Sequence, residues 1–193
     1  MKVKWKLALG VALCVFLLAA CSSAKELSIS TRSLTEKEQI LVKNSGGADM
    51  EYFVINGDLP EGQTLGITLE VHEKGKLVSE NEPGVFNEDF LADRNISFGI
   101  RQGWGDQNDE LIFSSSGGLI GLQLAPLKGA SSHGALIDEK VVLQMGEPVY
   151  LAYWITSEDL SIRGFGNAID EEELAALKAY DRAVLLKAEL RED

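Results

Sequence analysis

The apolar residues of this chain recur mainly with a period of two, and that pattern constrains the fold most. In segment 65–72 (LGITLEVH), Leu65, Ile67, Leu69 and Val71 occupy alternate positions. Successive side chains of a β-strand point to opposite faces, whereas an amphipathic helix repeats every 3.6 residues. The segment therefore predicts a half-buried strand. The sequence 73–76 (EKGK) that follows predicts a hairpin turn into a second strand at 77–79.

Further short apolar or alternating segments are separated by turn-forming residues. The other expected strands are 27–30, 39–43, 51–55, 96–101, 110–114, 119–124, 140–144 and 149–156. The expected turns or breaks are 44–49, 56–60, 103–105, 117–118, 129–132 and 146–148. Many short strands with such punctuation are typical of two packed antiparallel sheets. The sequence therefore predicts a mainly β fold, an antiparallel β-sandwich that is immunoglobulin-like or similar.

The C-terminal region contains the one helix that the pattern predicts. Asp170 and Glu173 match a capping box, and the acids at 170–173 complement the positive end of a helix dipole. The helix could continue to Arg191 with Leu177, Tyr180 and Val184 on one face. Alternatively, segment 184–191 (VLLKAELR) alternates cleanly as a strand. We expect a helix near 170–179 and a terminal strand near 183–190.

The first twenty residues have the composition of a signal peptide. Lys2, Lys4 and Lys6 precede segment 7–20 (LALGVALCVFLLAA), which contains no charged residue. Fourteen residues are too few for a spanning helix, which needs about 20, but they fit the apolar region of a signal peptide. Removing residues 1–20 would take three of the 18 basic side chains and none of the 30 acidic ones. The remainder would then have a formal charge of −15, which argues against nucleic acid as a partner.

The end of this segment resembles the lipobox of bacterial lipoproteins. The four residues are Leu18, Ala19, Ala20 and Cys21. The resemblance implies cleavage before Cys21 and a covalent diacylglyceryl lipid on its thiol, with no other cofactor. The alternative is ordinary secretion with Cys21 left free. We expect a signal peptide at 1–20, a lipidated tether at 21–26 and a single β-sandwich domain at 27–193.

Segments 68–78 and 180–187 loosely resemble small extracytoplasmic lipoproteins of Gram-positive bacteria. The resemblance implies a protein held on the outer face of the cell membrane by its lipid. Ser22 follows the lipobox cysteine, which would permit sorting to the outer membrane in a Gram-negative cell. The resemblance carries no known activity, and no functional residue is transferred from it.

Candidate residues for metal binding or catalysis are few. His72 and His133 are the only histidines. We expect His72 to lie on the surface near the hairpin and His133 to lie in a loop of small residues. Asp106, Asn108 and Glu110 have the alternate spacing of calcium ligands, but Leu111 and Gly117 stand where an EF-hand loop has glycine and glutamate. We expect no metal site and no catalytic residue, because hydrolase and P-loop signatures are missing.

Two aromatic residues flanked by glycines are candidates for binding loops. Trp104 lies in segment 103–105 (GWG), and Phe165 lies in segment 164–166 (GFG). An exposed aromatic side chain in such a loop can stack on a sugar or anchor a partner. Alternatively, Trp104 folds back over the end of the sandwich. Tyr150, Tyr153 and Trp154 lie within an expected strand and should pack in the core and at its rim.

These features favour a lipid-anchored extracytoplasmic β-sandwich that acts as a non-enzymatic binding or envelope-accessory module. Its partners would be the membrane, through the anchor, and an envelope protein, a polymer or a small ligand. The alternative is a lipid-anchored hydrolase, such as a carboxylate-based glycosidase, because the 30 acidic side chains offer many carboxylate pairs.

Overall fold

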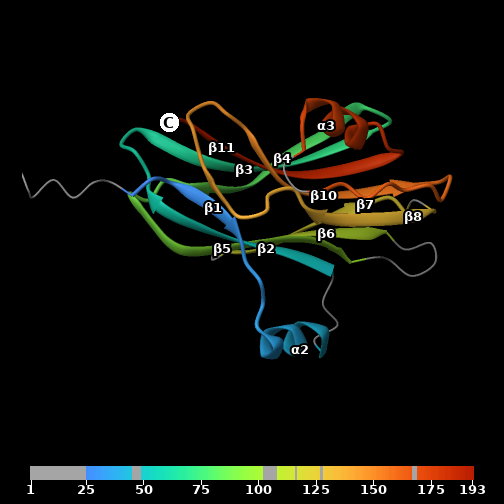
Figure 1. Ribbon diagram of the computed structural model, residues 1–193, viewed down its shortest axis with the longest axis horizontal. Helices are drawn as coiled ribbons and strands as arrows, with labels where there is room; N and C mark the ends of the chain where they lie inside the picture. The colour runs from blue at the N-terminus through green and yellow to red at the C-terminus, as the bar shows by residue number, and fades with distance from the viewer. Residues whose placement is uncertain (1–24, 45–48, 102–107, 116, 127, 167–168) are drawn as a thin grey trace, which may run out of the picture.

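The structure is a computed structural model that describes residues 25–44, 49–101, 108–115, 117–126, 128–166 and 169–193. The described chain forms two β-sheets packed face to face, with one helix outside each sheet (Figure 1). The elements are β1 (Ser28–Thr31), α2 (Glu36–Asn44), β2 (Asp49–Asp58), β3 (Gln63–Glu73), β4 (Lys76–Phe86), β5 (Phe90–Arg101), β6 (Asp109–Ser115), β7 (Gly118–Leu124), β8 (Ala130–Ala135), β9 (Lys140–Val142), β10 (Val149–Ser157), α3 (Glu171–Lys178) and β11 (Arg182–Glu192). No described helix is long and apolar enough to cross a membrane.

Sheet A has the strand order β7-β6-β5-β2-β1-β9, and sheet B has the order β4-β3-β11-β10-β8. Each neighbouring pair in these two orders is antiparallel. The predicted mainly β, antiparallel sandwich is therefore confirmed. The main core lies between the sheets, because one face of each is apolar. Leu65, Ile67, Leu69 and Val71 of β3 all belong to this core, as their alternation predicts.

Sheet B has a second apolar cluster on its outer face, beneath α3. Leu177 of α3 packs there with Tyr153 and Ile155 of β10 and Leu185 of β11. This second cluster explains why the central strands of sheet B are apolar on both faces. Helix α3 begins as predicted, since the Asp170 side chain accepts a hydrogen bond from the Glu173 backbone N–H at 2.8 Å. The terminal strand is also confirmed as β11.

The β3–β4 hairpin turns at the predicted residues. Lys74 and Gly75 have φ angles of 50° and 83°. Positive φ at both central residues is the requirement of a type I′ turn, which matches the twist of the flanking strands. The hairpin is thus specified locally.

Three of the expected segments of secondary structure are wrong. Segment 39–43, expected as a strand, lies in helix α2, because Thr35 and Glu38 form a reciprocal capping box at its start. Segment 129–132 was expected as a turn and His133 as a loop residue, but β8 begins at Ala130 and pairs with β10. Segment 56–60 does not break β2 at residue 56. The strand continues to Asp58 through a register shift next to Gly57.

Candidate functional site

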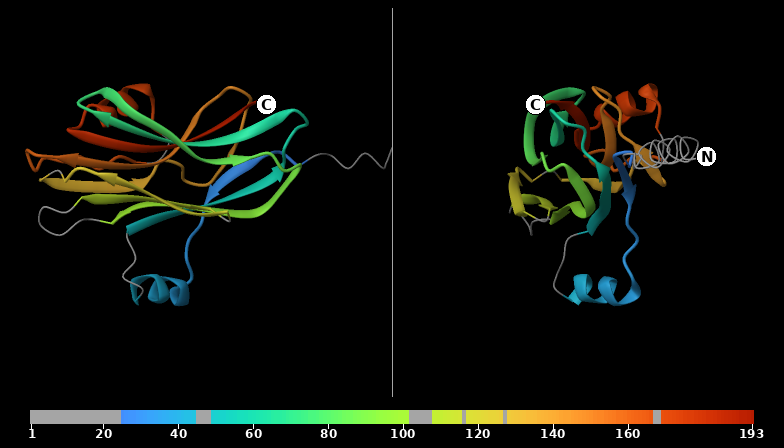
Figure 2. Two further views of the ribbon diagram at one scale, coloured as in Figure 1. Left: turned by 180° about the vertical axis from the view of Figure 1, so that it is seen from behind. Right: turned by 90° about the vertical axis from the view of Figure 1, so that its left-hand side faces the viewer.

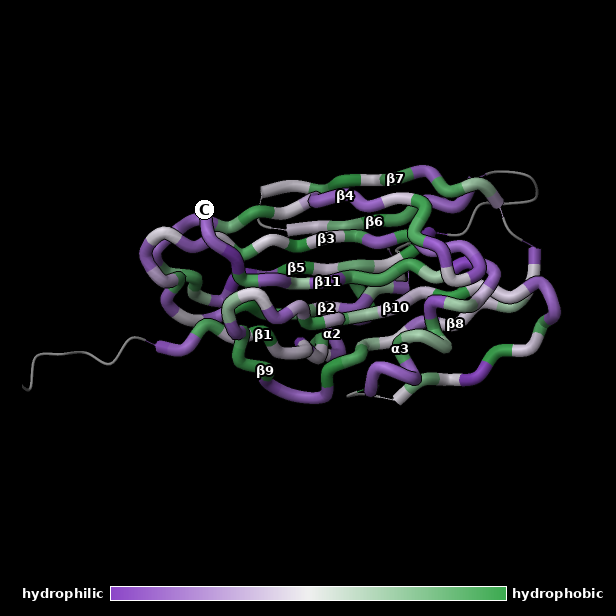
Figure 3. The backbone as a smooth tube through the Cα atoms, turned by 90° about the horizontal axis from the view of Figure 1, so that it is seen from above, coloured by the Kyte–Doolittle hydropathy of each residue, from purple (hydrophilic) through white to green (hydrophobic). Residues whose placement is uncertain are grey.

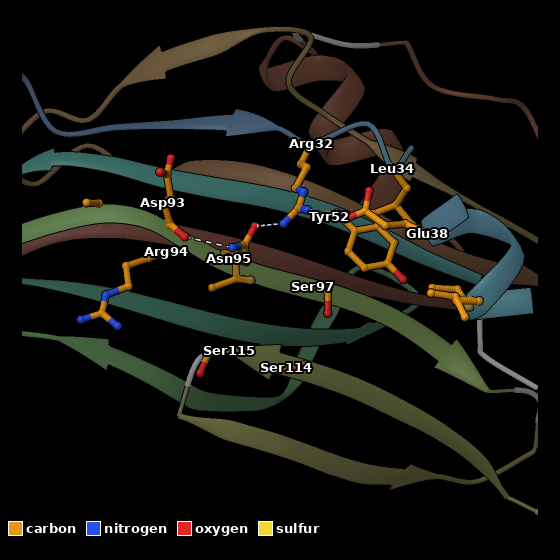
Figure 4. A pocket seen from close by; sticks show the side chains of 14 residues that line it. Arg32, Leu34, Glu38, Tyr52, Asp93, Arg94, Asn95, Ser97, Ser114 and Ser115 are labelled. Carbon is orange, nitrogen blue, oxygen red and sulfur yellow. Dashed lines mark hydrogen bonds and ion pairs between the residues drawn. The ribbon is translucent and has the colours of Figure 1, made fainter. Parts of the chain in front are cut away.

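A groove of about 580 Å³ lies between α2 and the outer face of sheet A (Figure 4). Helix α2 projects from the sandwich and does not pack flat against the sheet (Figure 2). The groove is lined by Arg32, Leu34, Glu38, Leu41, Val42, Tyr52, Ala92, Asp93, Arg94, Asn95, Ile96, Ser97, Ser114 and Ser115. Ligand pockets usually have volumes of about 300–1,000 Å³, so the groove has the size of a small-molecule site.

The floor of the groove is a row of hydroxyl groups that strand register assembles. Tyr52 of β2 lies opposite Ser97 of β5, and Ser97 lies opposite Ser114 of β6. Residues directly opposite in antiparallel strands share a face of the sheet. The three hydroxyls therefore line one row across sheet A, although their residues are far apart in sequence. Burial raises the pKa of Tyr52, so its hydroxyl stays protonated and can donate a hydrogen bond.

Arg32 joins the helix to the floor. Its Nη2 contacts Glu38 Oε1 of α2 at 2.7 Å, and its Nη1 donates a hydrogen bond to Asn95 Oδ1 of β5. The hydrogen bond from the Thr35 backbone N–H lowers the pKa of Glu38 most, and the Thr35 hydroxyl and the Arg32 charge lower it further. Glu38 is therefore a carboxylate, and the Arg32–Glu38 pair fixes α2 beside the sheet at this point.

A second hollow of about 450 Å³ continues from the groove on the β8 side of α2. The two share Arg32, Leu34 and Tyr52 as lining residues. The second hollow adds uncharged polar groups from Thr31, Ser33 and Gln39, and two acidic residues, Glu51 of β2 and Asp138 between β8 and β9. Together the hollows offer one continuous lining in which hydroxyl and amide groups outnumber charges.

Near the second hollow, His133 connects the two sheets. Its Nδ1 lies 3.1 Å from Glu51 Oε1 of β2, and its ring stacks on Trp154 with centroids 5.0 Å apart. The hydrogen bond to Glu51 raises the pKa of His133, against the opposing effect of burial. Protonation of His133 therefore strengthens a contact between β8 of sheet B and β2 of sheet A.

A buried charged cluster occupies the outer face of sheet B, and it corrects one expectation. His72, expected on the surface, is buried beside Glu70, with 3.0 Å between His72 Nε2 and Glu70 Oε2. Glu70 also contacts Lys187 Nζ at 2.7 Å and Lys178 Nζ of α3 at 3.7 Å. Burial alone would raise the pKa of Glu70. Hydrogen bonds from Lys187 and His72, together with both lysine charges, hold its pKa below the ordinary value. The cluster attaches α3 to the sheet.

The residues predicted for sites lie in several places. Leu18, Ala19, Ala20, Cys21, Trp104 and Asp106 lie outside the described residues. Phe165 is half-buried and packs edge-to-face on Tyr153 and Tyr180, with centroid distances of 5.7 and 6.0 Å. Glu110, one of the calcium candidates, is paired with Arg101 at 2.6 Å, and Asn108 is exposed. Within the described ranges, no group of three or more His, Cys, Asp or Glu side chains could hold a metal ion.

The sequence interpretation did not identify the groove residues. Its one local signal is the Thr35–Glu38 capping box, which marks the start of α2. The hydroxyl row depends on which residues of β2, β5 and β6 lie opposite one another, and a single strand does not reveal that pairing.

The described structure defines a class of protein, a two-sheet antiparallel β-sandwich with a ligand-sized groove beneath a projecting helix. The YgaN domain model matches residues 28–190, which is most of the chain. The chain therefore belongs to the YgaN domain family. No curated protein and no solved structure matched it.

Proposed function

We propose that this chain is a lipid-anchored extracytoplasmic binding module that holds a neutral ligand in the groove between α2 and sheet A. The observation that carries the proposal is the groove itself, with its row of hydroxyls and its apolar lip. The lipid anchor rests on the sequence alone, on Leu18, Ala19, Ala20 and Cys21. A lipid at Cys21 would hold the domain at the outer face of a membrane.

The charges of the lining balance, which favours an uncharged ligand. Arg32 is paired with Glu38, and Arg94 contacts Glu88. The two arginines of the lining are balanced by two acids, Glu38 and Asp93. The other polar lining residues are uncharged: Tyr52, Asn95, Ser97, Ser114 and Ser115. Buried or half-buried hydroxyls and amides select ligands that return their hydrogen bonds. An anionic ligand would find no unpaired partner among these arginines.

The apolar part of the lining narrows the ligand class further. Leu34, Leu41 and Val42 form one side of the groove, and the exposed fraction of Leu41 is 68%. A sugar that bears N-acetyl groups combines hydroxyls, an amide and a methyl group, and it matches both sides of the groove. Such sugars belong to bacterial cell-wall polymers, which an extracytoplasmic domain would meet. We therefore propose a neutral N-acetylated saccharide as the ligand.

The groove favours binding over hydrolysis. A glycosidase needs one carboxyl group that stays protonated as a general acid, which requires a raised pKa. Thr35 and Arg32 lower the pKa of Glu38, whereas a general acid needs a raised pKa. Its carboxylate is also occupied by those two partners. We therefore assign Glu38 to holding α2 in place, and we propose no reaction for the site.

The test is a calorimetric titration of the full chain with an oligosaccharide of N-acetylglucosamine. Leu41→Asp places a charge on the apolar lip, and Leu77→Asp is the matched control on β4, where the exposed fraction is 52%. We expect Leu41→Asp to weaken binding about ten-fold, equivalent to about 1.4 kcal/mol, and Leu77→Asp to leave it unchanged. Absence of binding by the wild-type chain would refute the saccharide class. Equal weakening by both variants would refute the location.

A further inference from the structure

Strand β7 forms one edge of sheet A and is unusually apolar for an edge. Its sequence, 118–124 (GLIGLQL), contains no charged residue and no proline. It pairs with β6 on one side, and among the described strands the order of sheet A ends there. An unpaired edge exposes a row of backbone N–H and C=O groups that can pair with another strand.

Two other edges of this sandwich, β9 and β4, carry protective features that β7 lacks. β9, the opposite edge of sheet A, has only three residues, and one of them is Lys140. β4, the neighbouring edge of sheet B, contains Pro83 together with Glu80 and Glu82. Short length, charges and proline each discourage strand addition. β8, the remaining edge of sheet B, is also free of proline and of Lys, Arg, Asp and Glu, but its sequence (ASSHGA) consists of small and polar residues. β7 lacks all three features and is in addition apolar, which indicates that this edge has a partner.

The sandwich also leaves the inner face of β7 incompletely covered. In Figure 3, β7 lies at the margin of the molecule, beyond β4. β4 packs instead over β6, since a Cβ at Gly84 would lie 3.3 Å from Phe113. A cleft of about 350 Å³ separates the Pro83–Phe86 part of β4 from the start of β7. Ile120, on this inner face opposite Phe113, therefore has an exposed fraction of 43%. Leu119, on the outer face opposite Ser114, has an exposed fraction of 64%.

We propose that β7 pairs antiparallel with β7 of a second copy of this chain, in a register centred on Gly121. This register pairs all seven residues of the strand. It sets Ile120 opposite Leu122 of the other copy, and Leu119 opposite Gln123. Ile120 and Leu122 share the core-facing side, because they lie opposite Phe113 and Leu111 of β6. Apolar residues directly opposite stabilise an antiparallel pair.

Charge explains why the occupant is a second copy. The chain has 30 acidic against 18 basic side chains, so two copies repel over most of their surfaces. β7 itself contains no charged residue, and Glu110, whose carboxylate lies beside Gly121, is paired with Arg101 at 2.6 Å. The β7 edge has no acidic side chain that would attract a basic partner strand. The chain itself contains an uncharged strand that can pair with this edge, which is β7 of a second copy. In a two-fold β7–β7 pair, each copy covers the β7 edge of the other. No β7 edge is then left for a third copy, so the assembly stops at a dimer. The proposal is independent of the ligand groove.

The first test is the mass of the full chain in detergent, measured by sedimentation equilibrium. We expect the wild-type protein mass to be twice that of one chain. Ile120→Lys places a charge in the pair and should give a single-chain mass. Leu41→Lys, an equally drastic change on α2, should remain dimeric. A monomeric wild type, a dimeric Ile120→Lys or a monomeric Leu41→Lys would each overturn the assignment.

The second test remains informative if Ile120→Lys fails to fold. The double variant Leu119→Cys with Gln123→Cys should form two disulfides across the pair, because opposite residues lie about 4.5–5.5 Å apart between Cβ atoms. Within one chain these positions are four residues apart, about 13 Å, and cannot be bridged. We expect a covalent dimer only with the double variant, against wild-type and single-cysteine controls. A double variant that stays monomeric on oxidation overturns the register and the pairing.

Discussion

Glu70 is the side chain whose removal should destabilise sheet B most. Its side chain is 7% exposed and holds Lys187 at 2.7 Å, His72 at 3.0 Å and Lys178 at 3.7 Å. In Glu70→Ala, these buried or half-buried partners lose their carboxylate. Removing one partner of a buried ion pair costs about 3–5 kcal/mol, because a charge is left without compensation. Lys187 retains Glu80 at 3.2 Å, so we expect the lower end, about 3 kcal/mol.

The assay is urea unfolding of the full chain at neutral pH, with thermal melting as a second measurement. In a domain of this size, 1 kcal/mol shifts Tm by about 2–4 °C, so Glu70→Ala should lower Tm by roughly 6–12 °C. Glu82→Ala is the matched control. It breaks the Glu82–Arg191 pair, which is 31% and 44% exposed, and exposed pairs contribute under about 1 kcal/mol. If both variants lower the free energy of unfolding by the same amount, burial is not the reason that the Glu70 ion pairs stabilise the fold.

The lowered pKa of Glu70 adds a pH test with a defined sign. A carboxyl whose pKa is lower in the folded than in the unfolded state stabilises the fold above its unfolded value, here 4.5. This contribution is lost as the pH falls through the folded pKa. The difference in unfolding free energy between wild type and Glu70→Ala should therefore be full at pH 7 and shrink below pH 4.5. A difference that stays constant down to acid unfolding would contradict the electrostatic account.

Two further predictions concern the anchor and the contact between the sheets. Cys21→Ala should abolish incorporation of radiolabelled palmitate and leave unprocessed precursor, whereas Cys14→Ala should remain labelled; labelling of Cys21→Ala would disprove the anchor. The pKa of His133 is higher in the folded than in the unfolded state, where it is 6.5. The contact of His133 with Glu51 therefore stabilises the fold fully below pH 6.5, and this contribution is lost as the pH rises through the folded pKa. His133→Gln should therefore lose more stability relative to wild type at pH 6 than at pH 9 by urea unfolding, and a pH-independent loss would exclude a role for the charge.

The strands and turns that were predicted correctly depend on neighbours in sequence. The alternation of Leu65, Ile67, Leu69 and Val71 specifies which side of β3 enters the core. The hairpin at Lys74 and Gly75 follows from backbone conformation within a few residues. The same holds for the α3 cap, where Asp170 reaches the next turn of its own helix.

Helix α2 marks the limit of such local prediction. Ile40, Leu41 and Val42 form an apolar run that is too short to separate a strand from a helix by period. The Thr35–Glu38 capping box decides for the helix, and α2 then stands away from the sheet instead of pairing with it. The groove exists only because of that position, so its prediction would have required the tertiary structure.

By itself, the sequence determined the strand-rich class, the β3–β4 hairpin and helix α3, since each depends on contacts within a few residues. Only the tertiary structure decided what covers each face of a strand. Alternation correctly placed His72 on the face of β3 that points away from the main core. That face is nevertheless covered, because Lys187 of β11 and Lys178 of α3 contact Glu70 there, and His72 is buried as a result. Likewise, the Tyr52, Ser97 and Ser114 row depends on register among three strands. A side-chain period reports which side a residue lies on, whereas burial and site geometry depend on partners distant in sequence.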